Sequence, residues 1–82
     1  MIRVIFLAQL REQLGIAELD VSSAHVKSLD ELKQQLVLQN PSWESTLLKS
    51  KVLTAVNHAY TKGNQTLVDG DEVAFFPPVT GG

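Results

Sequence analysis

Cysteine is absent from this chain of 82 residues. Small secreted domains of this size often rely on disulfides to stay folded, so the absence favours a reducing compartment. A chain without a thiol also has no metal–thiolate site, no redox pair and no cysteine nucleophile. Those kinds of chemistry are therefore excluded for the chain itself.

Long apolar runs and clustered positive charge are absent as well. Seven Lys and Arg residues are scattered among nine Asp and Glu residues, for a net charge of −2 and a pI of about 5.5. A nucleic-acid partner requires a basic patch or stripe, and the sequence has none. No stretch approaches the ~20 apolar residues of a membrane span, and the run "VIFLA" is too short for a signal peptide. We expect a mature cytoplasmic protein that binds neither nucleic acid nor membrane.

Common motifs of catalytic and metal sites are also missing. His25 and His58 have no neighbour at ligand spacing. The acidic run 69–72 is too short for a calcium loop, which needs about twelve residues, and its Asp-Gly pair is typical of a turn. The chain has no G-x-x-x-x-G-K-[ST] phosphate loop and no nucleophile elbow. We expect no metal site, and no ATP site of the chain's own.

The sequence does contain the pattern of one folded domain. Apolar residues make up 44% and charged residues 20%, and the length suits a single domain. β-Branched and aromatic residues predict strands at 2–8 and 16–21, a strand on each side of an Asn57-His58 turn, and a last strand at 72–76. The second strand is expected at an edge, forming a hairpin-like pair with the first.

Two helices are predicted between these strands. The longer one begins at Ser28, which forms an S-x-x-E capping box with Glu31, and ends at Asn40, which the following proline keeps out of helical geometry. The shorter one covers residues 9–14, and Gly15 is well suited to end it. A further helical turn is expected in "PSWESTLLK", with its Trp and a Leu docked on the body.

Alternation along the first and last strands sorts their apolar side chains onto two faces. Even-numbered residues 2–8 share one face of the first strand, and residues 5 and 7 share the other. In the last strand Val73 and Phe75 point one way, and Ala74 and Phe76 the other. Apolar residues on both faces fit a strand buried on both sides, or one that keeps a face for a partner. Alternation alone does not tell whether Phe75 or Phe76 faces outward.

This order of elements predicts an α+β fold. The best match is a β-grasp, in which a mixed four- to five-stranded sheet packs on one main helix. The body is expected over residues 1–76, followed by a flexible, extended tail over 77–82.

The composition of the tail suits insertion into a pocket of another protein. Pro77 and Pro78 stop strand pairing and favour stiff polyproline geometry, so the chain is projected away from the body. Fully extended, residues 77–82 span roughly 20 Å. Gly81 and Gly82 have no side chains, so a second protein could close around them and act on the terminal carboxylate of Gly82. The alternative is an ordinary frayed end, which a Gly-Gly pair without the proline spacer would favour.

The block "LVDGDEVAFFPPVTGG" resembles the C-terminal signature of the small, sulfur-carrying subunits of molybdopterin synthase. The resemblance extends over the whole chain through "IRVIFLAQLREQLG", the capped helix and "AVNHAY". It implies a ubiquitin-like β-grasp fold. It also implies that the Gly82 carboxylate is adenylated by an activating enzyme that uses ATP and Mg²⁺, then converted to a thiocarboxylate by a sulfur donor system.

The resemblance further implies the partners and the reaction. The large synthase subunit would receive the tail, residues 77–82, in a heterotetramer of two large and two small subunits. Two sulfur deliveries would convert precursor Z, a cyclic pyranopterin monophosphate, into molybdopterin. The small subunit would supply the reagent, and its partner most of the catalysis. A thiocarboxylate also suits a chain that has no cysteine.

Three other interpretations remain open. The sulfur carrier of the thiazole (thiamine) pathway also ends in Gly-Gly on a β-grasp body. A ubiquitin-like modifier would use the same adenylated tail to form isopeptide bonds, although such modifiers usually carry a basic residue where this chain has Val79-Thr80. A binding module would use the tail as an unmodified peptide ligand.

Three residues are candidates for the interface with the large subunit. One face of a β-grasp sheet packs on the helix, so apolar side chains on its other face need a partner, and Leu7 and Phe75 are the candidates. Phe75 lies next to the tail, and the resemblance implies that its position packs against the large subunit. An ordinary core role for Phe75 is an equal alternative. Arg11 lies on the short helix, where it either pairs with an acidic partner group or is simply solvated.

Overall fold

The computed structural model describes residues 1–78. Short helical turns at Ser23–His25, Pro41–Trp43 and Ser45–Lys49 complement the main elements. The main elements are β1 (Ile2–Phe6), α1 (Gln9–Leu14), β2 (Glu18–Val21), α2 (Leu29–Gln39), β3 (Leu53–Val56), β4 (Ala59–Thr61) and β5 (Glu72–Phe76).

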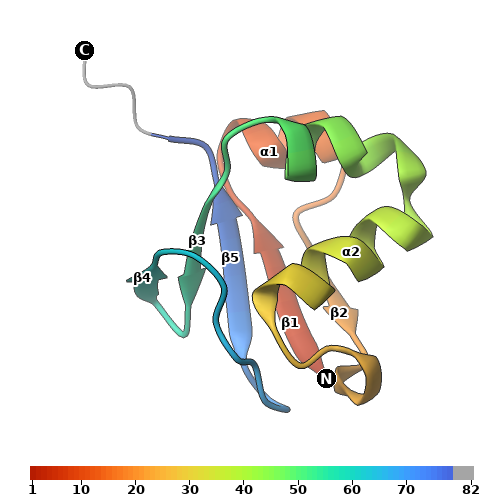
Figure 1. Cartoon of the computed structure of the whole chain (residues 1–82). Coiled ribbons are helices and arrows are strands. Elements are labelled where there is room, and N and C mark those ends of the chain that lie inside the picture. Colours follow the sequence, from red (N-terminus) through yellow and green to blue (C-terminus); the bar gives the residue numbers. More distant parts are fainter. Residues whose placement is uncertain (79–82) are drawn as a thin grey trace.

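The strands form one mixed five-stranded sheet in the order β2-β1-β5-β3-β4. β1 and β5 run parallel, and every other neighbouring pair is antiparallel. Helix α2 crosses one face of the sheet, while β5 runs up its middle and leads out of it (Figure 1). The predicted α+β arrangement, including the edge position of β2, is confirmed.

Helix α2 begins and ends where the sequence indicates. The Ser28 hydroxyl accepts a hydrogen bond from the Glu31 N–H at 3.2 Å. The Glu31 carboxylate reaches back one residue beyond the N-cap and accepts from the Lys27 N–H at 2.9 Å. At the other end Asn40 leaves helical geometry before Pro41. Both ends are thus fixed by local chemistry, as a capping box and a proline stop require.

The hydrophobic core lies between the sheet and α2. Helix α2 contributes three leucines to it, and the segment after α2 contributes Trp43 and Leu47, as expected from "PSWESTLLK". Phe6 stands at the centre of an aromatic group, edge-on to Trp43 at 5.4 Å and stacked with Phe75 at 5.9 Å between ring centroids. The remaining core residues are Ile2, Val4, Leu10, Val21, Val26, Val56, Leu67 and Val73.

The first strand is shorter than the sequence predicts. β1 ends at Phe6, and exposed Ala8 does not continue its buried face. Ala8 instead has φ 54° and ψ −131°, with the Leu10 N–H bonded to the Leu7 carbonyl at 3.2 Å. These values match the first central position of a type II′ turn, which favours glycine. The apolar pattern continues past the strand because alanine carries no signal for such a turn.

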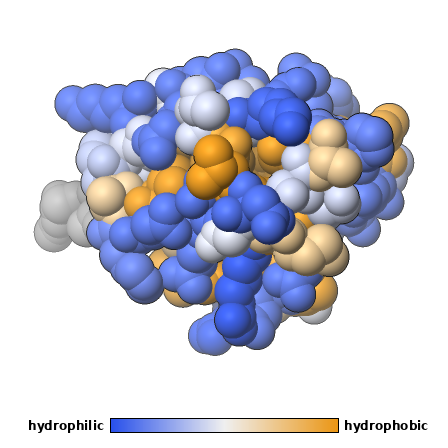
Figure 2. All heavy atoms as spheres, turned by 90° about the horizontal axis from the view of Figure 1, so that it is seen from below, coloured by the Kyte–Doolittle hydropathy of each residue, from blue (hydrophilic) through white to orange (hydrophobic). Residues whose placement is uncertain are grey.

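The end of the molecule opposite the tail is mostly hydrophilic. Figure 2 views this end and shows a small apolar cluster with polar residues around it. Here Met1 is joined to the turn before β5, since its carbonyl accepts from the Gly70 N–H at 3.0 Å. Within the described part of the chain, no helix is long and apolar enough to cross a membrane.

Candidate functional site

The candidate site is the point where β5 leaves the sheet. β5 lies between β1 and β3, so Phe76 and the prolines after it emerge from the middle of the sheet (Figure 1). The Leu7 N–H donates to the Phe75 carbonyl at 3.0 Å, and Leu53 is the register partner of Phe76. The start of the tail is therefore held from both sides.

The two phenylalanines at this point face opposite ways. Phe75 has 0% exposure and packs in the core, whereas Phe76 is half-buried on the other side of the strand. This corrects the expectation that Phe75 offers its side chain to a partner, because stacking on Phe6 removes that ring from the surface. Phe76 is the phenylalanine on the outer face.

An apolar surface extends across the sheet next to Phe76, on the face away from α2. Pairing places Ile5, Ala74 and Ala55 side by side across the three middle strands, and Tyr60 follows them on β4. Leu7, directly after β1, is 44% exposed, and Tyr60 is 54% exposed. We call this surface the outer face: Ile5, Leu7, Leu53, Ala55, Tyr60, Ala74 and Phe76. An apolar surface beside the point where the chain leaves the sheet is suited to docking on another protein.

Arg11 lies on α1, which packs against β5. Its side chain is exposed and forms no ion pair with the described residues. Leu7 and Arg11 both have exposed side chains, and their contacts with a partner stay predictions.

The remaining predicted tail positions lie outside the described residues. These are Val79, Thr80, Gly81 and Gly82, so their roles stay predictions. Pro77 and Pro78 are described, and both are half-buried. The division into a body over 1–76 and a tail over 77–82 also stays a prediction.

The acidic residues at 69–72 stabilise the turn that leads into β5. The Asp71 carboxylate accepts from the Val68 N–H at 2.9 Å and from the Asn57 side chain at 3.0 Å. Glu72 lies 3.3 Å from the His58 ring nitrogen. Among the described residues there is no group of three His, Cys, Asp or Glu side chains that could hold a metal ion. The interpretation of this run as a turn entering the last strand is thus confirmed.

Leu53 and Tyr60 are residues of the outer face that sequence reasoning did not single out, whereas Phe76 is the alternative to Phe75 that alternation leaves open. Alternation groups Leu53 with Ala55, but it does not reveal which of the two faces meets α2. Tyr60 is the partner of Ala55 only through the register of the β3–β4 hairpin.

A mixed sheet packed around one main helix is the defining feature of the β-grasp class of ubiquitin-like proteins, and this chain has that fold. The crystal structure of SAMP1 from Haloferax volcanii superposes with a TM-score of 0.80 over 99% of this chain and 98% of that one, at 24% identity. The chain also superposes on a chain of the complex of subunits 1 and 2 of the molybdopterin-converting factor from Helicobacter pylori, with a TM-score of 0.67 and 26% identity, over 99% of this chain and 97% of that one.

The chain belongs to the ThiS family, whose sequence pattern matches residues 4–82. It is 44% identical to the molybdopterin synthase sulfur carrier subunit of Escherichia coli (strain K12), over 100% of both chains. It is 34% identical to the Haemophilus influenzae protein of the same name, again over 100% of both.

Proposed function

We propose that this chain is a sulfur carrier in molybdenum cofactor biosynthesis and acts as the small subunit of molybdopterin synthase. The observation that carries the proposal is the full-length similarity, at 44% identity, to a relative named as that subunit. The fold supports it, because the chain leaves the middle of the sheet after Phe76, beside an apolar surface.

The reacting group would be the terminal carboxylate of Gly82. A carboxylate is a poor electrophile, so an activating enzyme would first join it to the α-phosphate of ATP, with Mg²⁺, and release pyrophosphate. A donor system that supplies sulfide-level sulfur (HS⁻) would then let that sulfur attack the acyl carbon and displace AMP, which leaves a thiocarboxylate. The chain itself has no cysteine that could compete for the sulfur.

The large synthase subunit would bind the outer face and take the tail into its active site. There the thiocarboxylate sulfur would attack a carbon of precursor Z and displace an oxygen substituent, and water would then hydrolyse the acyl C–S bond, which leaves the sulfur on the product and regenerates the carboxylate of Gly82. Binding holds the two reactants in attack geometry, which is where an enzyme gains much of its rate. This chain would then contribute a reagent and a docking surface, in a heterotetramer of two large and two small subunits. Cysteine-free composition favours a cytoplasmic location.

Deletion of Gly82 is the direct test. The variant should fold with an unchanged melting temperature, because the deleted residue lies beyond the strand that completes the core. Molybdopterin formation in a reconstituted synthase should fall to background, and mass spectrometry of the intact parent chain should find sulfur in place of oxygen on Gly82. The control is Leu38→Ala, which removes a side chain 75% exposed on α2.

The alternatives give different results. A deletion variant that still makes molybdopterin at the normal rate would contradict the proposal. A sulfur carrier of the thiazole pathway would acquire the thiocarboxylate but would not support molybdopterin formation with the large subunit. A protein modifier would produce higher-mass conjugates in cell extracts, and a passive binding module would keep an unmodified C-terminus.

A further inference from the structure

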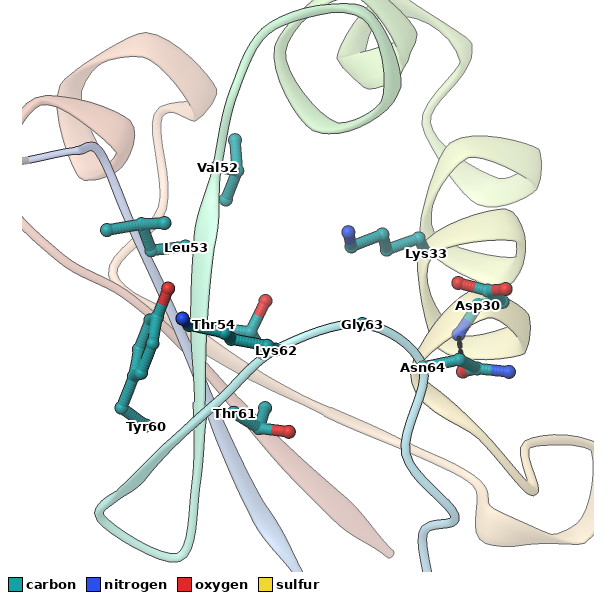
Figure 3. Close-up of a pocket in the computed structure, with 10 residues that line it drawn as sticks. All are labelled: Asp30, Lys33, Val52, Leu53, Thr54, Tyr60, Thr61, Lys62, Gly63 and Asn64. Carbon is teal, nitrogen blue, oxygen red and sulfur yellow. Dashed lines mark hydrogen bonds between the residues drawn. The ribbon is translucent and has the colours of Figure 1, made fainter.

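A polar groove lies between α2 and the β3–β4 hairpin, apart from the point where the tail leaves the sheet. Its volume is about 450 Å³, within the range of small-molecule sites. Figure 3 shows Lys33 reaching from α2 toward β3, with the loop at 62–64 passing beneath. The proposed chemistry at Gly82 does not use this groove, which shares only Leu53 and Tyr60 with the outer face.

The floor of the groove offers an unused hydroxyl. Thr54 is the buried polar residue of the described chain, at 6% exposure, and its side chain lies on the face of β3 that meets α2. Its hydroxyl makes no hydrogen bond to another described residue. Within residues 1–78 no fully enclosed side-chain oxygen or nitrogen lacks a partner, so the Thr54 hydroxyl keeps some exposure, and Thr54 lines the groove. A buried hydroxyl without a protein partner is a favourable place for a ligand oxygen.

Lys33 supplies a positive charge above this floor. The residue is half-buried, and its ammonium group extends from α2 into the space in front of β3 (Figure 3). It forms no ion pair with a described residue. An ammonium without a paired carboxylate, held beside the groove by a half-buried side chain, would attract an anion there.

The rim contributes backbone donors on a fixed loop. Gly63 has φ 72°, which turns the loop, and Asn64 ties it to α2 because its side-chain oxygen accepts from the Asp30 N–H at 2.9 Å. The N–H groups of Gly63 and Asn64 make no hydrogen bond within residues 1–78. Successive free N–H groups on a turned loop are a common component of anion sites.

We propose that the groove binds the phosphate group of a small molecule. The groove is lined by an ammonium from the helix, a hydroxyl from β3 and a loop with free N–H groups, three separate elements whose donors suit the several oxygens of a phosphate better than the two of a carboxylate. Lys62 adds a second positive charge to the lining and Asp30 a negative one. The groove exceeds the size of a bare phosphate, and Leu53 and Tyr60 at its outer lip would contact the organic part.

The test is a titration of the ¹⁵N-labelled chain, followed by NMR at constant ionic strength. The two probes are inorganic phosphate and phenyl phosphate. We expect saturable shifts at Thr54, Gly63 and Asn64, with phenyl phosphate binding more tightly and also shifting Tyr60. Lys33→Gln and Thr54→Val should each weaken phenyl phosphate binding, the former about tenfold.

Two further variants sharpen the test. Asp30→Asn should strengthen phosphate binding about twofold to threefold, since it removes a nearby negative charge. Lys27→Gln, which neutralises an exposed lysine outside the groove, should change nothing. Circular dichroism and unchanged shifts elsewhere in the spectrum show whether each variant is folded, and Thr54→Val tests the site independently of any change in charge.

Several results would overturn the proposal. Shifts that do not saturate, that occur near every lysine alike, or that persist in both Lys33→Gln and Thr54→Val would show only general ionic attraction. Equal affinity for acetate would show that phosphate is not the group recognised. None of these outcomes depends on Gly82, so the proposed sulfur chemistry stands or falls separately.

Discussion

The two ends of β5 are held by different forces. Where the strand enters the sheet, polar contacts fasten it: Asn57 donates to Asp71 and accepts from the Glu72 N–H, both at 3.0 Å. Where the strand leaves, apolar packing of Phe75 on Phe6 holds its inner side, and the outer side keeps Phe76 half-buried. At the entering end the polar side chains are hydrogen-bonded within the chain. At the leaving end an apolar face remains accessible to another protein.

Loss of the inner phenylalanine should have the largest effect. Phe75→Ala should lower the free energy of unfolding by about 4 kcal/mol, since a fully buried ring leaves a cavity. Urea denaturation followed by circular dichroism measures this. The matched control is Phe76→Ala, which should cost about 1 kcal/mol of stability and mainly weaken binding to the large subunit. Equal destabilisation by the two variants would contradict the assignment of faces.

The entering end should be less sensitive. Asn57→Ala should lower the free energy of unfolding by about 2 kcal/mol, because it removes two hydrogen bonds and puts alanine at a φ of 51°. Asn57→Gly keeps a residue that accepts positive φ, so it should recover about half of the loss. If both variants were as stable as the parent chain, the polar contacts at this end would not hold the strand.

The elements of the fold and their boundaries can largely be predicted from the sequence. Which side chains of the last strand form the outer face cannot. Ser28, Glu31 and the proline after Asn40 mark α2 because capping and proline stops act within a few residues. Phe75 and Phe76 are chemically identical, so only the tertiary packing of Phe6 and α2 decides which one is buried.

Other features escape sequence reasoning for the same reason. Thr54 and Lys33 come together only when β3 and α2 pack, so no spacing along the chain reveals their groove. The parallel pairing of β1 with β5 joins segments at opposite ends of the sequence. Ala8 gives no sign of its positive φ, because the turn is imposed by the elements on either side.

The turn at Ala8 should be a source of strain beside the leaving end. Ala8→Gly should raise the free energy of unfolding by about 1 kcal/mol, since relief of the strained backbone exceeds the added entropy of the unfolded chain. The comparison is Gly15→Ala, at φ 79°, which should lower stability by a similar amount. Equal stability of Ala8→Gly and the parent chain would show that this turn is unstrained.

The smallest effect should be a pH dependence confined to the entering end. A hydrogen bond from the N-terminal ammonium, and next one from the Ser23 hydroxyl, lower the pKa of Asp69. A carboxylate whose pKa is lowered by folding stabilises the fold above its ordinary pKa of about 3.9 and loses that contribution as the pH falls through the lower folded value. Asp69→Ser should therefore have a slightly lower urea midpoint than the parent chain at pH 6, and the difference should vanish near pH 2. Because the carboxylate is fully exposed, added salt should also shrink the difference. A difference that persisted in acid would mean that the turn itself, and not the charge, accounts for what Asp69 contributes.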